Sequence, residues 1–589
     1  QYSVSREVLN ELGLHDLPIL AVAKGKNRNA GKEKIYHENK EYILKKNDPL
    51  EIEELFGRFL DFGTGGLRGK MGVGTNRINN YTIQMATEGL ARIIEKNFIS
   101  NGKNKVVVGY DNRNNSLDFA KKTCEVLLAH KLKVLLFKNI SPTPLVSCEI
   151  LRQKAVCGII ITASHNPPEY NGYKVYWETG GQIVPPIDDQ IINEVKKIRG
   201  LEKIIQISFA EGKNKKNFCW IDKESDQNYL NSVRELSLGK KKNNNKLGLI
   251  FSPLHGTGGR LVPKLLQLQG FSKLKLVDKQ MKPDGNFSTL SSPNPEDISS
   301  YKMSLRTATI EDELILVNDP DADRLGVMVR DSNKQFQFLS GNQIGVLLLE
   351  HILLNLKRKN SLTEKNAIIT TFVSTPLIKV IAKEFKLKVI EVLTGFKWVK
   401  QAALNFEKDH GGKFVFAMEE SNGYLMGNHS GDKDGVWAAM AFAEMNAELK
   451  SQNLTPIDKL NQIYKKYGTF MDKLETKTFQ GETGLKRISE IVSSLRNSNP
   501  LYIGGEKVLK VTDLLNSKIK WIQKNKVTKG PNLPKSNVIS FELGDGSRII
   551  VRPSGTEPKI KYYFNLRGEK IEILNNKFLE MRNSIIAKD

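Results

Sequence analysis

The chain repeats one pattern of apolar strands and helical segments three times, and this repeat limits its fold to a few architectures. Each short apolar run is followed by a longer segment with helical spacing, as in 118–132 and 376–385. Strands that alternate with helices predict α/β domains. The predicted strands are 106–110, 133–137 and 157–161 in the first set, 247–251, 274–277 and 314–317 in the second, and 368–372, 389–393 and 413–417 in the third.

The last part of the chain has a different pattern. Two apolar runs, 538–543 and 547–551, flank a Gly-Asp-Gly turn at 544–546, and this predicts a β-hairpin. A further strand at 560–566 and a closing helix at 570–587 make this part α+β. A chain of 589 residues exceeds what one hydrophobic core can organise, so several domains are expected.

The predicted fold class is therefore α/β: three similar α/β domains with mixed sheets and a C-terminal α+β domain. Lys- and Asn-rich loops near residues 213 and 240 flank the first domain boundary, and 456–477 is expected to link the third domain to the fourth. The predicted division is an N-terminal extension at 1–60 that packs on the first domain, then domains at 61–215, 216–330, 331–460 and 461–589. The extension contains no interpretable motif.

The charge balance leaves one alternative of a different class. The chain has 89 Lys and Arg against 65 Asp and Glu, a formal net charge of +24, which is one signature of a nucleic-acid-binding protein. However, the lysines crowd with asparagines in loops such as 213–217 and 240–246, as is typical of solvated surfaces. No helix-turn-helix, zinc-finger or aromatic RNA-binding pattern organises them. The basic balance also suits small anionic substrates, and we favour that interpretation over nucleic acid.

The composition points to a cytoplasmic protein without a membrane partner. No stretch approaches the roughly 18 apolar residues of a membrane span, and the first residues contain no apolar signal core. The four cysteines form neither a CxxC pair nor a zinc-binding spacing. Such cysteine usage favours a reducing compartment.

The segment 162–174, Thr-Ala-Ser-His-Asn-Pro-Pro-Glu-Tyr-Asn-Gly-Tyr-Lys, is the most informative motif. It follows an apolar strand, and its Asn-Pro step forces a sharp turn that places Ser164 at the carboxyl end of the sheet, where open α/β sheets bind ligands. A serine beside His165, with Lys174 close by in sequence, suggests a nucleophile with acid–base partners. The alternative is a serine that caps a following helix.

The segment 318–324, Asn-Asp-Pro-Asp-Ala-Asp-Arg, also follows a predicted strand. Alternate residues of an extended loop face the same way, so Asp319, Asp321 and Asp323 can converge on one cation. An EF-hand is excluded, because Arg324 and Arg330 stand where that loop needs Gly and Glu. Three carboxylates without His or Cys favour a hard cation, Mg²⁺ before Zn²⁺. The alternative is a solvated acidic turn.

A third motif, Arg-Pro-Ser-Gly-Thr-Glu-Pro-Lys at 552–559, has the donors of a phosphate-binding loop. Arginine offers a bidentate fork for phosphate, hydroxyls add donors, and glycine lets backbone N–H groups approach an anion. The candidate ligands are Arg552, Ser554, Gly555, Thr556 and Lys559. An ordinary turn is the alternative.

Weaker signals complete the candidate site. Glu419 and Ser421 follow one predicted strand, and Thr394 and Gly395 follow a neighbouring one, so the two loops should share one rim that could bind sugar hydroxyls. Lys433 lies further along the same region. A Gly-rich loop at 62–69 carries Arg68, although such a loop can equally be a flexible turn.

Together these motifs resemble the α-D-phosphohexomutase family, and most closely its phosphoglucomutase/phosphomannomutase members with a long N-terminal extension. The matching segments run in family order from about 62 to 559. They are 162–174 as phosphoserine loop, 319–324 as metal loop, 419–421 as sugar-binding loop and 552–559 as phosphate-binding loop, together with 252–259 and 292–296. The resemblance implies four domains around one central active-site cleft.

The resemblance also implies a mechanism. Ser164 would carry a phosphoryl group, and a sugar hydroxyl would take it while Lys174 or His165 acts as general base. Glucose 1,6-bisphosphate would be the intermediate and activator, and the fourth domain would close as a lid. The implied catalytic residues are Ser164, His165, Lys174 and Arg68, and the implied Mg²⁺ ligands are Ser164, Asp319, Asp321 and Asp323. The implied substrate-binding residues are Arg324, Thr394, Gly395, Glu419, Ser421, Lys433, Arg552, Ser554, Gly555, Thr556 and Lys559.

Two loops bear on the choice of sugar. Thr394-Gly395 resembles the glucose-type branch, whereas Tyr424 stands where some relatives have histidine. The resemblance favours interconversion of glucose 1-phosphate and glucose 6-phosphate, and it also allows mannose phosphates as substrates. A phosphopentomutase or a hexose-bisphosphate synthase of the same family is the alternative. The enzyme is expected to be a monomer or a dimer.

Overall fold

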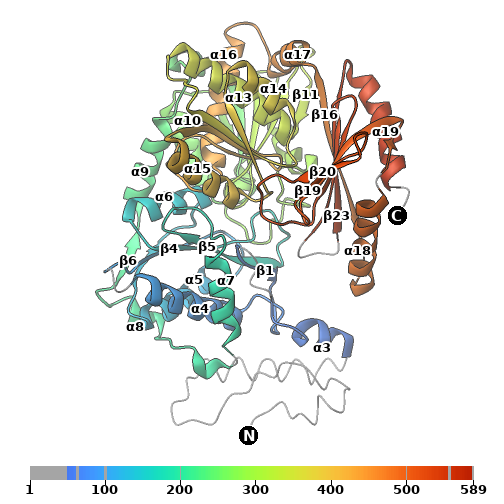
Figure 1. The fold of residues 1–589 in the computed structure, drawn as a ribbon. Coiled ribbons are helices and arrows are strands. Elements are labelled where there is room, and N and C mark those ends of the chain that lie inside the picture. The colour runs from blue at the N-terminus through green and yellow to red at the C-terminus, as the bar shows by residue number, and fades with distance from the viewer. Residues whose placement is uncertain are drawn as a thin grey trace. The chain divides into compact units, whose positions relative to one another are not determined.

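The computed structural model describes residues 49–60, 65–98, 102–198, 200–479, 481–498, 500–554 and 559–586 (Figure 1). The chain divides into two compact units. The first unit runs to Arg330 and includes Phe336–Phe338 and Asn422–Ser451, and the second comprises Asp331–Gln335, Leu339–Ser421 and Gln452–Asp589. Most of the predicted extension at 1–60 lies outside the described residues, and its described part begins with α3 (Pro49–Phe56). None of the described helices is long and apolar enough to cross a membrane.

The first sheet of the first unit has the strand order β1-β5-β4-β2-β3-β6. β2, β3, β4 and β6 run parallel to one another, whereas β5 is antiparallel to both β4 and β1. The strands are β1 (Gly66–Lys70), β2 (Lys105–Tyr110), β3 (Lys133–Phe137), β4 (Cys157–Ile161), β5 (Tyr170–Trp177) and β6 (Phe218–Ile221). The sheet is therefore mixed, as predicted.

Helices pack on both faces of this sheet, which explains why its parallel strands are apolar without a break. Val106 and Val108 of β2 belong to one hydrophobic cluster with α4 and α5, while Gly109 faces Val146 of α6. α4 packs against α5 and α7, and α6 packs against α9. The helices are α4 (Asn80–Phe98), α5 (Ser116–Ala129), α6 (Thr143–Gln153), α7 (Ile187–Lys196), α8 (Phe209–Gly212) and α9 (Lys223–Arg234).

A cluster of one histidine and two glutamates joins α4 to the end of α5. His130 is 7% exposed, and its Nε2 lies 3.0 Å from a carboxylate oxygen of Glu88 while its Nδ1 lies 2.8 Å from one of Glu95. Burial alone would lower the pKa of His130, but the two carboxylates outweigh it and raise that pKa. Both ring nitrogens can donate to carboxylates only when the imidazole is protonated.

This cluster predicts a pH-dependent contribution to stability. Because the folded-state pKa of His130 exceeds the unfolded value of about 6.5, the contribution is complete below that pH and is lost as pH rises through the folded pKa. We expect His130→Gln to lower the thermal midpoint of unfolding by about 2–4 °C at pH 6 and by less at pH 8.5. The exposed His410→Gln is the control. An equal loss at both pH values would contradict the charged pairing.

The second sheet of the first unit has the order β11-β10-β9-β7-β8. β7 is parallel to β8 and β9, and β10 turns back antiparallel to β9 after only a short connection. The strands are β7 (Gly248–Ser252), β8 (Leu274–Leu276), β9 (Asp312–Asn318), β10 (Leu325–Arg330) and β11 (Phe336–Leu339). The helices here are α10 (Gly258–Leu268), α11 (Asp278–Met281), α12 (Lys302–Thr307) and, after the short strand β15 (Gly423–Leu425), α16 (Gly435–Lys450). α16 packs on α10, β9 and β10 and is buried almost all round.

The second unit begins with a parallel arrangement in which β12 lies between β13 and β14. These strands are β12 (Asn366–Thr371), β13 (Lys388–Val392) and β14 (Lys413–Glu419), close to the predicted third set. The helices of this part are α13 (Gly341–Arg358), α14 (Leu377–Glu384), α15 (Phe396–His410) and α17 (Pro456–Tyr467).

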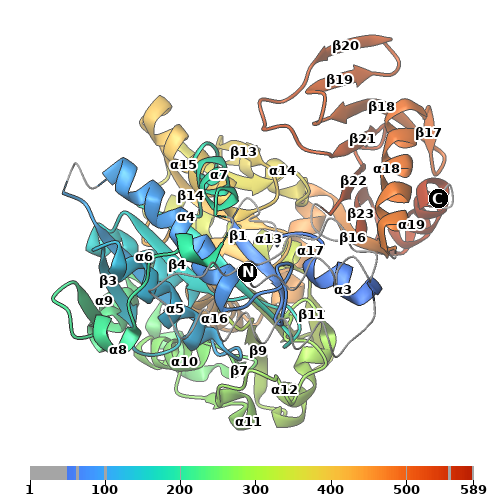
Figure 2. The same cartoon turned by 90° about the horizontal axis from the view of Figure 1, so that it is seen from below.

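The C-terminal sheet of the second unit is antiparallel, with the order β16-β23-β22-β21-β18-β19-β20 and β17 paired to β18. Figure 2 shows its strands from β20 to β16, with α18 and α19 along one side. The predicted hairpin is β21 and β22, and the closing helix is α19. The strands are β16 (Thr469–Thr478), β17 (Tyr502–Ile503), β18 (Glu506–Asp513), β19 (Lys518–Trp521), β20 (Lys526–Lys529), β21 (Ile539–Leu543), β22 (Arg548–Pro553) and β23 (Lys559–Gly568), and the helices are α18 (Gly481–Ser498) and α19 (Ile571–Ile586).

The fold class predicted from the sequence is confirmed: mixed α/β sheets are followed by an antiparallel C-terminal sheet with two helices. The segment 456–477, predicted as a link, forms α17 and most of β16, and β16 pairs along its whole length with β23. A hydrophobic cluster, which includes Phe372, Ile550 and Tyr563, packs the C-terminal sheet onto the end of β12. Arg548 of β22 adds a hydrogen bond of 2.9 Å to the carbonyl oxygen of Ser374.

Candidate active site

The loop after β4 carries Ser164 in a strained conformation. Ser164 has φ 51°, in the left-handed region that non-glycine residues seldom adopt, and its N–H donates to the hydroxyl of Thr162 at 2.9 Å. The chain then continues into β5, which pairs antiparallel with β4. The alternative interpretation, a serine that caps a following helix, is therefore wrong, because a strand follows this turn. The side chain is almost fully buried, at 4% exposure.

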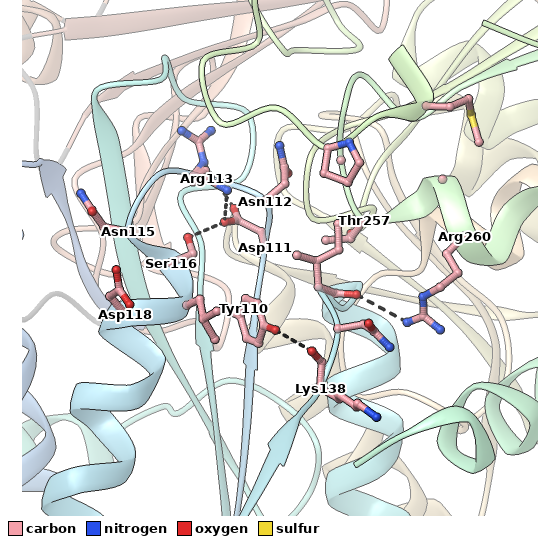
Figure 3. Close-up of a pocket in the computed structure, with 17 residues that line it drawn as sticks. Tyr110, Asp111, Asn112, Arg113, Asn115, Ser116, Asp118, Lys138, Thr257 and Arg260 are labelled. Carbon is pink, nitrogen blue, oxygen red and sulfur yellow. Dashed lines mark hydrogen bonds and ion pairs between the residues drawn. The ribbon is translucent and has the colours of Figure 1, made fainter. Parts of the chain in front are cut away.

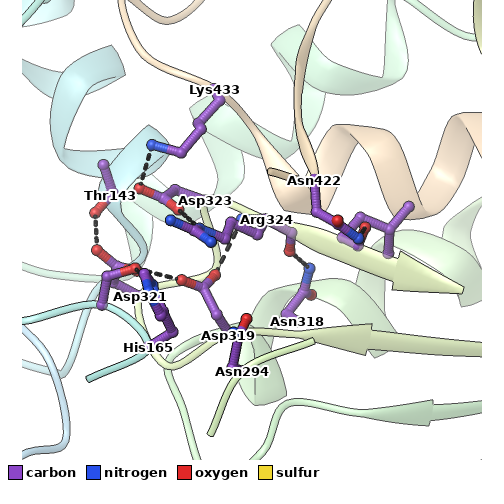
Figure 4. Close-up of polar contacts among 12 residues, drawn as sticks. Thr143, His165, Asn294, Asn318, Asp319, Asp321, Asp323, Arg324, Asn422 and Lys433 are labelled. Atoms are coloured by element: carbon purple, nitrogen blue, oxygen red, sulfur yellow. Dashed lines mark hydrogen bonds and ion pairs between the residues drawn. The ribbon is translucent and has the colours of Figure 1, made fainter. Parts of the chain in front are cut away.

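The three aspartates predicted as metal ligands lie together in the turn between β9 and β10 (Figure 4). Asp319, Asp321 and Asp323 are fully buried, and one carboxylate oxygen of each lies within 4.8 Å of those of the others. The Ser164 hydroxyl donates to Asp319 Oδ2 at 2.6 Å. The first unit thus brings together two motifs that are more than a hundred residues apart in sequence.

The electrostatics of this cluster fit a cation. Burial, and then the charges of Asp321 and Asp323, raise the pKa of Asp319 well above its ordinary value. Burial opposes ionisation of Asp321 too, but Lys174 holds the pKa of that carboxyl below its usual range. Oδ1 of Asp321 and Oδ1 of Asp323 are buried without a hydrogen-bond partner. Buried carboxylates with unsatisfied oxygens are suitable ligands for a hard cation such as Mg²⁺.

Two lysines face the same carboxylates. Lys174 Nζ lies 2.8 Å from Asp321 Oδ2 and 3.4 Å from Asp323 Oδ2, and Lys433 Nζ lies 2.8 Å from Asp323 Oδ2. Burial would lower the pKa of Lys174, but Asp321 and Asp323 raise it. Lys433 was predicted to lie near the sugar-binding rim, and the structure positions it against the acidic cluster within the first unit.

His165 and the predicted arginines surround the serine. His165 Nδ1 lies 3.3 Å from Ser164 Oγ, and burial followed by the charges of Arg324 and Arg68 holds the pKa of His165 well below its ordinary value. Arg68, on β1, donates to the carbonyl oxygen of Ala163 at 2.8 Å. Arg324 donates its backbone N–H to Asp319 and pairs through its guanidinium with Glu296 at 2.5 Å.

The predicted rim of the second unit is also assembled. Glu419 ends β14, and its Oε1 accepts the N–H of Gly395, which precedes α15, at 2.7 Å. Gly395 has φ 114°, a conformation that favours glycine. Glu420 accepts the Thr371 hydroxyl at 2.8 Å, so the β12 and β14 ends are tied together. Thr394, which precedes Gly395, and Ser421, which follows Glu420, are half-buried.

The described residues of the phosphate-binding motif lie where β22 ends and where β23 begins. Ser554 N–H donates to the carbonyl oxygen of Lys559 at 2.7 Å. Arg552 lies opposite Lys561 in the antiparallel register of β22 and β23. Arg552, Ser554 and Lys559 are half-buried. Gly555 and Thr556 lie outside the described residues.

Several residues at this site were not anticipated. Thr143, at the start of α6, donates to Asp321 Oδ2 at 3.0 Å, and Arg113 donates to the carbonyl oxygen of Ser164 at 2.5 Å. Thr257 bonds through both its N–H and its hydroxyl to the carbonyl oxygen of Pro320, so the 252–259 segment supports the acidic turn. The available signal was positional, because Arg113 and Thr257 follow strands next to those that end in Ser164 and Asp319.

Four family models match successive parts of the chain. They are the phosphoglucomutase/phosphomannomutase alpha/beta/alpha domain I at residues 60–202, domain II at 227–333, domain III at 340–467, and the C-terminal domain at 506–571. The chain belongs to the phosphoglucomutase/phosphomannomutase family. The members of this family are phosphotransferase-type isomerases, so this protein is an enzyme of that class.

Individual members of the family match over nearly the whole chain. The phosphoglucomutase of Staphylococcus aureus strain USA300 is 36% identical over 531 residues, which cover 89% of this chain and 93% of that protein. The phosphoglucomutase of Staphylococcus epidermidis strain RP62A is 33% identical over 90% of this chain and 94% of that protein.

Solved structures of the family share the fold. A putative phosphomannomutase from Thermus thermophilus matches with a TM-score of 0.66 at 21% identity, covering 90% of this chain and all (100%) of the other. The open form of Paramecium pp63/parafusin, a phosphoglucomutase, matches with a TM-score of 0.66 at 22% identity, covering 90% and 93%.

Proposed function

We propose that the protein interconverts glucose 1-phosphate and glucose 6-phosphate through a phosphoserine at position 164, with glucose 1,6-bisphosphate as intermediate and activator. The observation that carries this proposal is the 2.6 Å contact between Ser164 Oγ and Asp319, one of three fully buried aspartates. The 36% identity to a phosphoglucomutase over most of both chains supports the choice of substrate.

Each half of the reaction transfers one phosphoryl group. A sugar hydroxyl attacks the phosphorus, a new oxygen–phosphorus bond forms, and the bond from phosphorus to Ser164 Oγ breaks. The bisphosphate then turns over and returns its other phosphate to Ser164. A Mg²⁺ ion held by Ser164, Asp319, Asp321 and Asp323 would supply charge stabilisation for the transferred group. Arg68 and Arg324 flank the serine and offset the negative charge of the phosphoryl oxygens.

Two side chains are candidates for the general base. His165 lies 3.3 Å from Ser164 Oγ, and Lys174 lies on β5 against Asp321 and Asp323. A base must reach the proton of the attacking hydroxyl, and both residues border the position of the phosphoryl group. The pH profile of kcat in His165→Asn and in Lys174→Met would identify which of them carries the proton.

The remaining predicted residues would hold the sugar and its second phosphate. We propose that Glu419, Ser421 and the Thr394-Gly395 turn bind sugar hydroxyls. Lys433, which precedes α16 and lies against Asp323, would also contact the substrate. A second phosphate would be bound by Arg552, Ser554, Gly555, Thr556 and Lys559. Binding energy from this non-reacting phosphate positions the reacting one.

We also propose the domain division 61–215, 216–330, 331–460 and 461–589, with the last domain as a lid. The ranges of the four family models support this division. We propose further that the enzyme is cytoplasmic and that it is a monomer or a dimer.

A substrate comparison tests the proposal. Glucose 1-phosphate, mannose 1-phosphate and ribose 1-phosphate are supplied separately at equal concentration with Mg²⁺ and a trace of the corresponding bisphosphate. We expect glucose 1-phosphate to give the highest kcat/KM, by at least about tenfold over ribose 1-phosphate, because one pocket contact is worth about 1–3 kcal/mol. A dominant ribose rate would replace the glucose assignment with a pentose one, and formation of net bisphosphate would indicate a synthase.

A further inference from the structure

The loop at the end of β2 contains an arginine to which the proposed reaction assigns no role. β2 lies beside β4 in the first sheet, so Arg113 emerges next to the loop that carries Ser164. Its side chain is fully buried. The guanidinium donates to the carbonyl oxygen of Ser164 at 2.5 Å, of Asn166 at 2.5 Å, of Pro167 at 2.8 Å and of Tyr170 at 3.0 Å.

Arg113 is itself held in place. Asp111 Oδ1 accepts the backbone N–H of Arg113 at 2.9 Å and the Ser116 hydroxyl at 2.7 Å, and Asp111 Oδ2 lies 3.4 Å from Arg113 Nε (Figure 3). The guanidinium carbon of Arg113 lies 5.0 Å from the ring centre of Phe287, within the range of a cation–π contact. The loop therefore presents a rigid set of donors to its neighbour.

The serine loop needs such donors. Its two prolines, Pro167 and Pro168, have no N–H, so this segment cannot form a regular backbone ladder. Its carbonyl groups must find side-chain donors when they are buried, and one guanidinium serves four of them. These contacts also support the strained φ of 51° at Ser164, a conformation that persists only where the surroundings determine it.

We propose that Arg113 is a positioning residue for phosphoryl transfer. It sets the path of residues 164–170 and keeps Ser164 Oγ beside Asp319. Because a trans peptide is planar, a Ser164 carbonyl that points to Arg113 also makes the N–H of His165 point away from Arg113. The inference rests on the proposed phosphoserine chemistry at Ser164.

A lysine cannot replace this arginine. Lysine would keep the positive charge and much of the length, but its ammonium has three donors at one point, whereas the planar guanidinium has five in a fixed fork. Arg113→Lys therefore removes the clamp while it keeps the charge. Asp111→Asn is the second variant, since it keeps the acceptor for the Arg113 N–H but removes the charge that orients the guanidinium.

The test uses the full chain, with kcat and KM for glucose 1-phosphate measured per folded molecule and thermal midpoints recorded for each variant. We expect Arg113→Lys to lower kcat about 100-fold, since a misplacement of about 1 Å costs that much, and to change KM less than about threefold. Asp111→Asn is expected to lower kcat about tenfold. Added guanidinium ion is expected to restore part of kcat in Arg113→Ala. Arg152→Lys, on the outer side of α6 and paired with Glu149, is the matched control and should keep the wild-type kcat.

The outcomes separate the two proposals. Intact mass of the wild type after incubation with glucose 1,6-bisphosphate reports whether Ser164 accepts a phosphoryl group, and its absence would refute the proposed function itself. If the wild type is phosphorylated and turns over while folded Arg113→Lys has the same kcat, the positioning role is overturned. It is equally overturned if the total activity of the variant falls only in proportion to its folded fraction. Should Arg113→Lys not fold, an unchanged kcat in Asp111→Asn overturns it.

Discussion

Ser164→Ala is expected to abolish mutase turnover, with kcat lower by at least about 10⁴-fold, as is found when a covalent nucleophile is removed. The physical reason is that alanine lacks the oxygen that would carry the phosphoryl group, and in the wild type this oxygen, Ser164 Oγ, lies 2.6 Å from Asp319. The measurement is the conversion of glucose 1-phosphate to glucose 6-phosphate in a coupled assay. The intact mass of the variant after incubation with bisphosphate should also show no added phosphoryl group.

The control must show that the loss of activity comes from the missing hydroxyl and not from a damaged fold. Ser232→Ala, on α9 with its hydroxyl bonded to the carbonyl oxygen of Asn228, should keep full activity. Alanine, like serine, has an unbranched Cβ, so the steric strain at the φ of 51° is about the same and the thermal midpoint should stay close to that of the wild type. Full activity of Ser164→Ala would refute the phosphoserine assignment and the proposed function with it.

Most of the parallel strands were predictable because burial on both faces leaves an unbroken apolar signal, although the short edge strand β6 was not predicted. Cys157–Ile161 of β4 and Gly248–Ser252 of β7 illustrate this, since all their residues are buried. β5 was not predicted, because Tyr170–Trp177 mixes aromatic and polar residues and pairs antiparallel at the border of the parallel strands. Its residues could be assigned a motif from sequence but no secondary structure.

The candidate site was predictable where its residues are contiguous in sequence. Asp319, Asp321 and Asp323 form one short run, so their convergence follows from local geometry. Arg113 and Thr143 could not be found in this way, because each acts on a loop far away in sequence through tertiary packing. The same holds for Glu296, which holds Arg324, although its segment was noted as a family match without a role.

Asp321→Asn is expected to raise the Mg²⁺ concentration for half-maximal activity by at least about tenfold and to lower kcat. Asparagine has nearly the same shape, and its oxygen can still accept from Thr143, which donates at 3.0 Å. What is lost is one negative charge of the cluster and a buried carboxylate oxygen without a hydrogen-bond partner. Loss of this charge also removes one cause that raises the pKa of Asp319.

Two measurements distinguish a lost ligand from a damaged fold. A cation that binds the folded state raises the thermal midpoint by mass action, so MgCl₂ should stabilise the wild type and stabilise Asp321→Asn distinctly less. Asp222→Asn, at the exposed start of α9, keeps its capping oxygen and should behave as the wild type in both assays. A Mg²⁺ profile and a Mg²⁺-induced stabilisation equal to those of the wild type would exclude Asp321 as a ligand. Because Asp319 and Asp323 share the same buried turn, that outcome would also require the divalent cation to bind elsewhere on the chain.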